Sequence, residues 1–188
     1  MNDQQRARML QLARDTVQAK LAGQPLPDVA PFDCADVPHS GAFVTLRNCG
    51  RLRGCIGTFS PQGTLPETIR DMAKAACDDP RFFADPVGLD ELGELRIEIS
   101  VLSPLTRTDD PLSLELGKHG IYIRRGVAGG CFLPQVATEL GWDKETFLSQ
   151  CCRSKAGLPA DAWRDPDTEV LLFTAEVFGE EQGDAEGR

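Results

Sequence analysis

Apolar side chains recur along this chain in two rhythms, one typical of helices and one typical of strands. Over residues 3–22 they return at spacings of three and four, which predicts an amphipathic helix with Asp3 as its cap and Gly23 as its stop. Over residues 95–102 they alternate one by one with polar residues. This alternation predicts a strand that turns one face to a core and presents a polar face on the other side.

A hairpin and a second helix are predicted between these two elements. Residues 42–47 and 51–59 have strand-like composition on either side of a tight turn, so we expect them to pair. After the hairpin, Thr64 and Glu67 have the spacing of a capping box, which predicts the start of a helix. Pro80 is expected to end that helix.

The second half of the chain repeats this mixture of short strands and helices. Residues 121–124 predict a short strand, and residues 126–130 predict a glycine-rich loop. Short helices are expected after Pro134 and after Asp143, with Asp143 as the cap of the second. Residues 168–178 are apolar over most of their length, which predicts a strand covered on both sides.

The order of these elements mixes hairpins with helices and does not alternate strictly, which predicts an α+β fold with mostly antiparallel sheets flanked by helices. The length of 188 residues suits one domain, or two small lobes that share a core. Residues 179–188 are acidic, rich in glycine and poor in apolar side chains, so we expect them to form a disordered tail.

Charge and composition restrict the classes of function. The net charge of -9 argues against general nucleic-acid binding, because a phosphate backbone would be repelled. The chain has no apolar run of about 20 residues, and residues 1–6 are polar rather than signal-like, so we expect no membrane association. Seven scattered cysteines in a chain without such a signal indicate free thiols in a reducing cytoplasm.

The stretch around Cys55 is the strongest candidate for chemistry. If residues 51–59 form a strand, Arg53 and Cys55 lie on the same face, because side chains two apart in a strand point the same way. Gly54 and Gly57 have no side-chain bulk, so a ligand or another backbone can come close. The nearby cation favours the thiolate, which makes Cys55 a candidate nucleophile. The same pattern also describes a small buried side chain in a strand.

Four further residues are candidates for a site. His119 is flanked by glycine-containing sequence at a strand entrance, where an imidazole can project into a cleft, and Glu98 projects from the polar face of its strand. Arg81 follows the break at Pro80 and could clamp a carboxylate or phosphate. Gln135 lies at a loop-to-helix junction and could bind a substrate. Each also has a structural interpretation, as a solvated side chain or as a partner of backbone groups.

No metal or cofactor site is predicted. Paired cysteines at the two-residue spacing of zinc and iron–sulfur sites are absent from the sequence. The chain also has neither a glycine-lysine phosphate loop nor a dinucleotide-binding fingerprint. We therefore expect neither a bound metal nor a cofactor.

Several blocks of the chain, taken in order, resemble one known family. Residues 52–57, Leu-Arg-Gly-Cys-Ile-Gly, are similar to the signature of the AMMECR domain family, also called protein A of the AmmeMemoRadiSam system. The resemblance implies a single domain over residues 1–178, built of two intertwined lobes, and the family pattern includes His119. Further matching blocks extend it over nearly the whole chain: residues 41–46, 79–82, 97–102, 117–121, 133–136 and 155–158.

The resemblance implies a shared pathway with a Memo-type protein and a radical S-adenosylmethionine enzyme, without assigning a reaction to this component. One interpretation is a cysteine-dependent enzyme, or enzyme component, that acts with those partners on a small anionic substrate. Its residues would be the nucleophile Cys55, the proton-handling His119 and Glu98, and the substrate-binding Arg53, Arg81 and Gln135. The other interpretation is a non-catalytic adaptor or ligand-binding module that docks the same partners through the Cys55 face.

Overall fold

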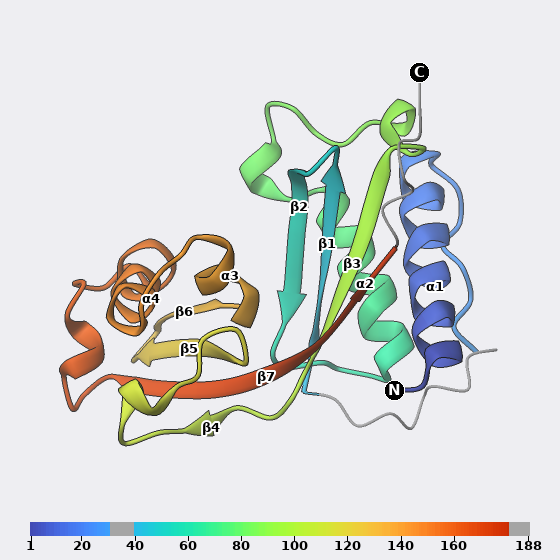
Figure 1. The fold of residues 1–188 in the computed structure, drawn as a ribbon. Coiled ribbons are helices and arrows are strands. Elements are labelled where there is room, and N and C mark those ends of the chain that lie inside the picture. The colour runs from blue at the N-terminus through green and yellow to red at the C-terminus, as the bar shows by residue number, and fades with distance from the viewer. Residues whose placement is uncertain (31–39, 181–188) are drawn as a thin grey trace. The chain divides into compact units, whose positions relative to one another are not determined.

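A computed structural model of the chain describes residues 1–30 and 40–180 and divides into two compact units (Figure 1). The first unit comprises residues 1–101 and returns from residue 176 onward, and the second comprises residues 102–175. Both contain helices and antiparallel strands, so the predicted α+β fold is confirmed. Among the described residues, no helix combines the length and the apolar character needed to cross a membrane.

The first unit has an antiparallel sheet in which β2, β1 and β3 follow in this order and the end of β7 lies next to β3, with α1 and α2 packed side by side on one face (Figure 1). The apolar positions of the strands alternate, so that the helix-facing side carries the core of the unit. Its elements are α1 (Asp3–Leu21), β1 (Ala42–Asn48), β2 (Arg51–Thr58), α2 (Leu65–Cys77), the short 3-10 helices η1 (Pro80–Phe82) and η2 (Leu89–Glu91), and β3 (Leu95–Leu102).

The two helices begin with capping boxes. Thr64 caps α2 and Glu67 returns the bond, which confirms the sequence prediction. The cap of α1 is Asn2 rather than the predicted Asp3, because Asn2 and Gln5 have the spacing that lets each side chain bond to the backbone amide of the other. The shift is one residue and leaves the helix where it was expected.

The two glycines beside Cys55 are packing positions. A Cβ added to Gly54 would lie 2.1 Å from the carbonyl oxygen of Ala76, so this glycine lets the backbone of α2 approach the sheet. A Cβ added to Gly57 would lie 2.1 Å from the ring of Phe43, so that ring occupies the space above the glycine. The sequence predicted that a ligand or another backbone comes close to these glycines, and at Gly54 a backbone does so. At both glycines the space is filled by a group of the protein itself.

A β-bulge separates Arg53 from Cys55. Strand β1 pairs Leu46 with Gly54 and then Arg47 with Leu52, so Arg53 has no partner on β1. An extra residue of this kind breaks the simple alternation and re-aims its side chain. The prediction that Arg53 is the same-face neighbour of the thiol is therefore wrong.

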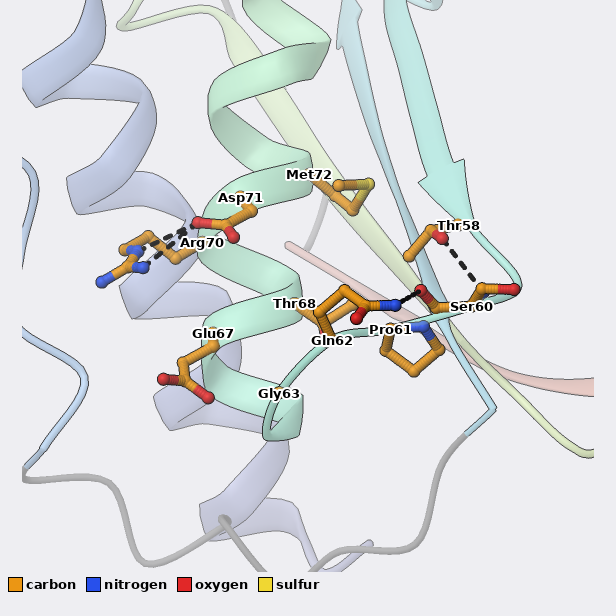
Figure 2. A pocket seen from close by; sticks show the side chains of 10 residues that line it. All are labelled: Thr58, Ser60, Pro61, Gln62, Gly63, Glu67, Thr68, Arg70, Asp71 and Met72. Carbon is orange, nitrogen blue, oxygen red and sulfur yellow. Dashed lines mark hydrogen bonds and ion pairs between the residues drawn. The ribbon is translucent and has the colours of Figure 1, made fainter.

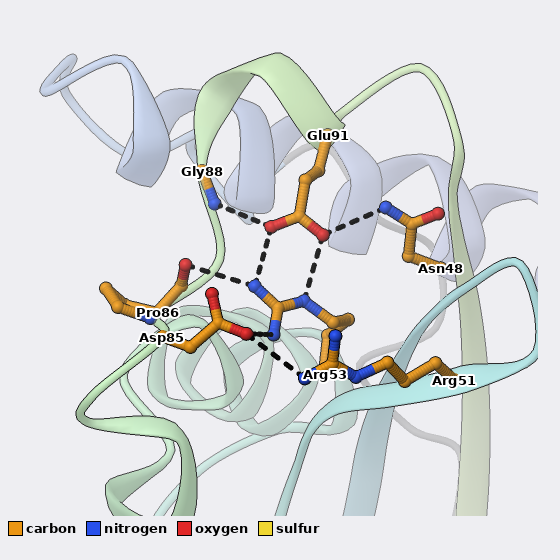
Figure 3. Close-up of polar contacts among 7 residues, drawn as sticks. All are labelled: Asn48, Arg51, Arg53, Asp85, Pro86, Gly88 and Glu91. Atoms are coloured by element: carbon orange, nitrogen blue, oxygen red, sulfur yellow. Dashed lines mark hydrogen bonds and ion pairs between the residues drawn. The ribbon is translucent and has the colours of Figure 1, made fainter.

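The Arg53 guanidinium instead binds two carboxylates from the segment that precedes β3 (Figure 3). Its Nε and Nη2 donate to Glu91 at 2.9 and 2.7 Å, its Nη1 donates to Asp85 at 2.9 Å, and Nη2 also donates to the carbonyl of Pro86. The side chain is only 4% exposed. Glu91 further accepts a hydrogen bond from Asn48, so this ion-pair cluster holds the segment against the hairpin.

The second unit is an antiparallel sheet in the order β4-β7-β5-β6 with two short helices. A π-helical turn, η4, directly follows α4, and the core between the sheet and these helices contains Phe147, Leu148 and Trp163. The elements are β4 (Thr106–Arg107), η3 (Pro111–Ser113), β5 (His119–Arg125), β6 (Ala128–Phe132), α3 (Pro134–Glu139), α4 (Lys144–Cys151), η4 (Cys152–Ala156), η5 (Ala162–Arg164) and β7 (Glu169–Gly179), whose residues from 176 onward belong to the first unit.

The predicted loop over residues 126–130 is wrong. Strands β5 and β6 pair as far as Arg125 with Ala128, so the connection is a two-residue turn and the remaining glycines lie in a strand. A Cβ on Gly130 would lie 2.3 Å from the backbone of Lys155, so this glycine permits close packing rather than a loop. The predicted cap at Asp143 is confirmed.

Glu180, the last described residue, is tied into the first unit. Its carboxylate accepts hydrogen bonds from Arg14 and, at 2.9 Å, from the backbone amide of Ile97. Its own amide donates to the Ile97 carbonyl at 3.0 Å. Arg14 also donates to the carbonyls of Leu92 and Leu95. A disordered tail was expected from residue 179. Instead, Gly179 is the last residue of β7 and Glu180 makes the bonds just described. The rest of the expected tail, residues 181–188, lies outside the described residues.

The ion-pair cluster around Arg53 predicts a pH-dependent stability. The hydrogen bond from Arg53, helped by Asn48 and the Gly88 amide, lowers the pKa of Glu91 from 4.5 to about 2. A carboxylate with a depressed pKa stabilises the fold above its unfolded pKa, and this contribution is lost as the pH falls from about 4.5 towards 2. The shift corresponds to roughly 3 kcal/mol. Glu91→Gln should therefore lower the melting temperature at pH 7 by about 6–12 °C.

The same variant should lose less stability than the wild type between pH 4.5 and pH 2, as measured by chemical denaturation at each pH. Glu94→Gln is the matched control, because Glu94 is an exposed neighbour, and it should change the melting temperature by about 1 °C or less. Equal acid dependence in the wild type and in Glu91→Gln would contradict the prediction.

A second prediction separates Glu180 from the residues that follow it. A chain that ends at Glu180 should melt within about 1 °C of the full chain, because residues 181–188 are too poor in apolar side chains to add packing. Glu180→Gln in the full chain should lower the melting temperature by about 2–6 °C, because the charge-assisted bonds from Arg14 and Ile97 are weakened. A lower melting temperature in the truncated chain but not in Glu180→Gln would contradict the prediction, because it would show that residues 181–188 contribute to stability and the Glu180 carboxylate does not.

Candidate functional site

Cys55 lies in a row of polar side chains on the sheet face opposite the helices. Strand β1 pairs Thr45 with Cys55 on one side and with Glu98 on the other, and directly opposed residues share a face. The neighbouring positions along each strand face the helices instead. One example is Leu46, which is paired with Gly54 and belongs to the core of the unit. The Thr45 hydroxyl donates a hydrogen bond to the Cys55 sulfur at 3.3 Å. Cys55, Thr45 and Glu98 form the Cys55 row, which brings together two of the predicted site residues.

Ser100 lies on the same face, two residues along β3 from Glu98. Its residue is 1% exposed, and its hydroxyl finds no hydrogen-bond partner within the part of the chain that the structure describes. Ser100 is paired with Phe43 on β1, and the Phe43 ring covers Gly57, its partner on the other neighbouring strand, β2. A buried polar group without a partner is uncommon and calls for a ligand or water. Ser100 could not be singled out from the sequence, because a serine on the polar face of a strand is ordinary.

The free edge of β2 is capped at Cys55. The Cys55 amide donates to the Asp79 carboxylate at 2.9 Å, and the Cys55 carbonyl accepts a hydrogen bond from Arg81 Nη2 at 3.1 Å. Arg81 also donates to both oxygens of Asp79, at 2.6 Å in the shortest contact. Since the Cys55 backbone points to these groups and away from β1, Thr45 and Cys55 form a non-hydrogen-bonded pair, in which side chains approach closely. Asp79 and Arg81 thus take the place of a further strand.

The electrostatics of this cap are those of a tight ion pair. Burial alone would raise the pKa of Asp79, but the hydrogen bonds from Arg81 and from the Cys55 and Arg81 amides lower the pKa of this carboxyl overall. The Asp79 carboxylate and, more weakly, Cys55 raise the pKa of Arg81. The Arg81 side chain remains 47% exposed. Arg81, rather than Arg53, is therefore the arginine that the structure brings to Cys55.

Asp79 was not predicted as a site residue, although the sequence contained a signal for it. An aspartate followed by proline is typical of a helix cap, and Asp79 caps η1 through the Arg81 amide. What the sequence could not give is the second role of the carboxylate, at the edge of a strand 24 positions away.

The described cysteines are all free thiols in different surroundings. Cys55 and Cys131 are half-buried, and Cys49 is exposed. Burial raises the pKa of Cys77 to about 11, and burial also raises the pKa of Cys151 and of Cys152. These three buried thiols are poor nucleophiles near neutral pH.

His119 and Gln135 belong to the second unit. His119 begins β5, and its Nδ1 accepts a hydrogen bond from the Glu115 amide at 3.0 Å. It lines a hollow of about 370 Å³ beside β4 and β7. Gln135 lies in the first turn of α3, after Pro134, where the loop-to-helix junction was expected. Within the first unit, Arg81 contacts the backbone of Cys55 at the edge of β2, and Glu98 lies in the same row as Cys55 but two strands away, on β3.

Hollows also lie among the described residues of the first unit, and Cys55 lines neither of the following two. One of about 280 Å³ lies between the loop after β2 and the first turns of α2, where Thr58, Gln62 and Asp71 are among the lining residues (Figure 2). The other, of about 460 Å³, lies beside the Arg53 cluster and is lined by Cys49 and Arg51. Over residues 1–30 and 40–180, no three His, Cys, Asp or Glu side chains gather as a metal site would require.

Comparison with known proteins identifies the family. The AMMECR1 family description matches residues 10–178. Protein TK0174 of Thermococcus kodakarensis is 47% identical over 152 residues, which cover 75% of this chain and 73% of that protein. A protein of Methanothermobacter thermautotrophicus is 41% identical over 185 residues, which cover 92% and 93% of the two chains.

A solved structure of the same kind agrees with this match. The crystal structure of the uncharacterized protein PH0010 from Pyrococcus horikoshii superimposes with a TM-score of 0.88 at 37% identity, covering 96% of this chain and 94% of that one. The family match covers both units and includes the Cys55 row, the cap of β2 and His119. The chain therefore belongs to the AMMECR1 family.

Proposed function

We propose that this protein is a cysteine-dependent enzyme, or the cysteine-bearing component of one, that acts in the cytoplasm on a small anionic substrate. The observation that carries the proposal is the setting of Cys55. Its half-buried thiol accepts a hydrogen bond from Thr45, and the partly exposed Arg81 is bonded to its backbone. A hydrogen-bond donor and a nearby cation both favour thiolate over thiol.

The proposed step is a nucleophilic attack by Cys55. The sulfur forms a bond to an electrophilic carbon of the substrate, and the leaving group departs with the electron pair of the bond that breaks. The thiol proton passes to a base, a role that we assign to Glu98 of the Cys55 row. The other expected base, His119, belongs to the second unit, and its Nδ1 already accepts a hydrogen bond from the Glu115 amide. Arg81 holds the anionic end of the substrate.

Arg53 was expected to bind the substrate, and in this proposal it supports the fold instead. Its charge is matched by Glu91 and Asp85, and its side chain is buried. A buried, fully paired guanidinium supports the fold of the hairpin more readily than it holds a substrate. We therefore assign the anion-holding role in the first unit to Arg81 alone.

The partners of this chemistry are part of the same proposal. We propose that the protein works with a Memo-type protein and a radical S-adenosylmethionine enzyme, which the family resemblance implies. The free thiols suit a reducing compartment in which such a complex would operate. The attack by Cys55 on an electrophilic carbon requires no cofactor.

The alternative is a non-catalytic adaptor that docks those partners through the Cys55 face. One observation favours it: the residues around the thiol serve packing. Gly54 admits α2, Gly57 admits the Phe43 ring, and Arg53 anchors the segment before β3. On this reading the signature builds a rigid surface, and Cys55 is a small side chain within it.

Alkylation rates test the proposed reactivity. Cys55 should react with iodoacetamide at pH 7 faster than the other six cysteines, as measured by mass spectrometry of each cysteine-containing peptide. Thr45→Val and Arg81→Gln should each slow the reaction about fivefold, which corresponds to a loss of ~1 kcal/mol in stabilisation of the reacting thiolate. Thr45→Ser, which keeps the hydroxyl, is the matched control for Thr45→Val. Labelling confined to the exposed Cys49 would count against the enzyme.

The variant Cys55→Ser distinguishes the two functions. For a nucleophile in an open site, it should keep the melting temperature within about 2 °C and abolish the labelling. For a packed group, the buried hydroxyl should cost ~1–3 kcal/mol. Cys77→Ser gives the reference for a buried thiol. A destabilised Cys55→Ser protein that still binds the partner proteins in sedimentation experiments would support the adaptor.

A further inference from the structure

The edge of β2 is open two residues beyond the cap at Cys55. Gly57 is paired with Phe43, in the same way that Cys55 is paired with Thr45. Non-hydrogen-bonded pairs recur at every second residue of an antiparallel ladder, so the amide and the carbonyl of Gly57 point away from β1, as those of Cys55 do. Among the described residues, neither group of Gly57 takes part in a hydrogen bond. Gly57 therefore offers one donor and one acceptor at a free strand edge.

Arg81 has a further donor at the same edge. Its Nε and Nη2 bind Asp79, and Nη2 also binds the Cys55 carbonyl, but Nη1 makes no hydrogen bond within the described part of the chain. Along the outer edge of β2, the Cys55 carbonyl is followed by the Gly57 amide, so the guanidinium lies on the Gly57 side of the cap. Arg53 binds two carboxylates in the same unit, so the pairing of Arg81 with Asp79 leaves room for a second anion.

A hollow lies beside the same end of β2. It has a volume of about 280 Å³ and lies between Thr58, the loop that follows β2 and the first turns of α2 (Figure 2). Thr58 is paired with Ala42 of the core, so its side chain lies on the helix-facing side of the sheet. Met72 and Pro61 give the hollow an apolar part, and polar side chains surround them. The hollow therefore begins one residue after Gly57.

We propose that this edge binds the C-terminal end of an extended polypeptide. A strand that adds antiparallel to β2 runs with its C-terminus towards Cys55. Asp79 and Arg81 already occupy the edge there, so the added chain has to end opposite Gly57. The terminal residue donates its amide to the Gly57 carbonyl, and its carboxylate accepts hydrogen bonds from the Gly57 amide and from Arg81 Nη1.

The penultimate residue of the ligand makes the site one for a polypeptide. It lies opposite Thr58, and residues that oppose each other share a face, so its side chain enters the hollow. Main-chain bonds and one side-chain pocket are the usual parts of recognition by strand addition. The inference rests on the anion-holding role of Arg81 in the proposed function, but not on the reactivity of Cys55.

The probe is the tripeptide acetyl-Ala-Leu-Ala with a free carboxylate. It is titrated against the full chain at constant ionic strength and followed by NMR, with the Gly57 amide proton as the reporter. A saturable downfield shift is expected, because this proton becomes bonded to a carboxylate. The C-terminal amide of the same peptide should bind about tenfold more weakly, because it loses the charge-assisted bonds. Acetyl-Ala-Gly-Ala, which leaves the hollow empty, should bind about fivefold more weakly.

Protein variants locate the carboxylate. Arg81→Gln should weaken binding of the free-carboxylate peptide about tenfold and leave binding of its amide unchanged. Arg51→Gln is the matched control, because Arg51 is an exposed arginine at the other end of β2 that pairs with Asp85, and it should leave binding of both peptides unchanged. Arg81→Gln also leaves Asp79 without its ion pair, and the comparison of the two peptides on the wild-type chain does not need this variant.

Three results would overturn the inference. They are the absence of saturable binding, equal affinity for the carboxylate and the amide peptides, and binding of N-acetylalanine as tight as that of the tripeptide, which would make a free acylated amino acid the ligand. Cys55→Ser should bind the tripeptide as the wild type does. Rapid alkylation of Cys55 without peptide binding would overturn this inference alone, and peptide binding with an unreactive Cys55 would overturn only the proposed enzyme.

Discussion

A buried positive charge has to be matched by negative charge close to it, and the first unit is arranged around one such requirement. The bulge in β2 directs Arg53 into the protein, where Glu91 and Asp85 neutralise it. Matching this charge fixes the segment between α2 and β3 along the hairpin. The same segment supplies Asp79 and Arg81, which complete the edge of β2 at Cys55. The arginine thus organises the surroundings of the thiol without lying beside it.

The two units use glycine in comparable ways. In each, a glycine within a strand lets a backbone approach, Gly54 for α2 and Gly130 for the turn at Lys155. In the first unit, the arginine that remains partly exposed, Arg81, is bonded to the backbone of Cys55. The proposed thiol chemistry therefore rests on a cation at a strand edge, while the buried cation serves the fold.

The sequence was informative where local chemistry decides the structure. The alternation over residues 95–102 and the Thr64 capping box both depend on neighbours within a few residues, and both were predicted correctly. The bulge at Arg53 depends on how β1 and β2 pair, and Gly130 lies in a strand because a distant backbone packs on it. Asp79 meets Cys55 only after folding. Alternation alone cannot reveal such non-local contacts, so the sequence names Cys55 and Arg81 as candidates but does not predict their geometry.

The cap on β2 has a consequence for the kind of reaction that Cys55 can carry. Thiol enzymes that transfer acyl groups stabilise a tetrahedral oxyanion with preorganised donors, for which backbone amides are a common source. The Cys55 amide already donates its hydrogen bond to the Asp79 carboxylate, which also accepts hydrogen bonds from Arg81. An acyl oxyanion at this sulfur would have to find its donors elsewhere. Substitution at a saturated carbon creates no oxyanion, and this geometry accommodates it without rearranging the strand edge.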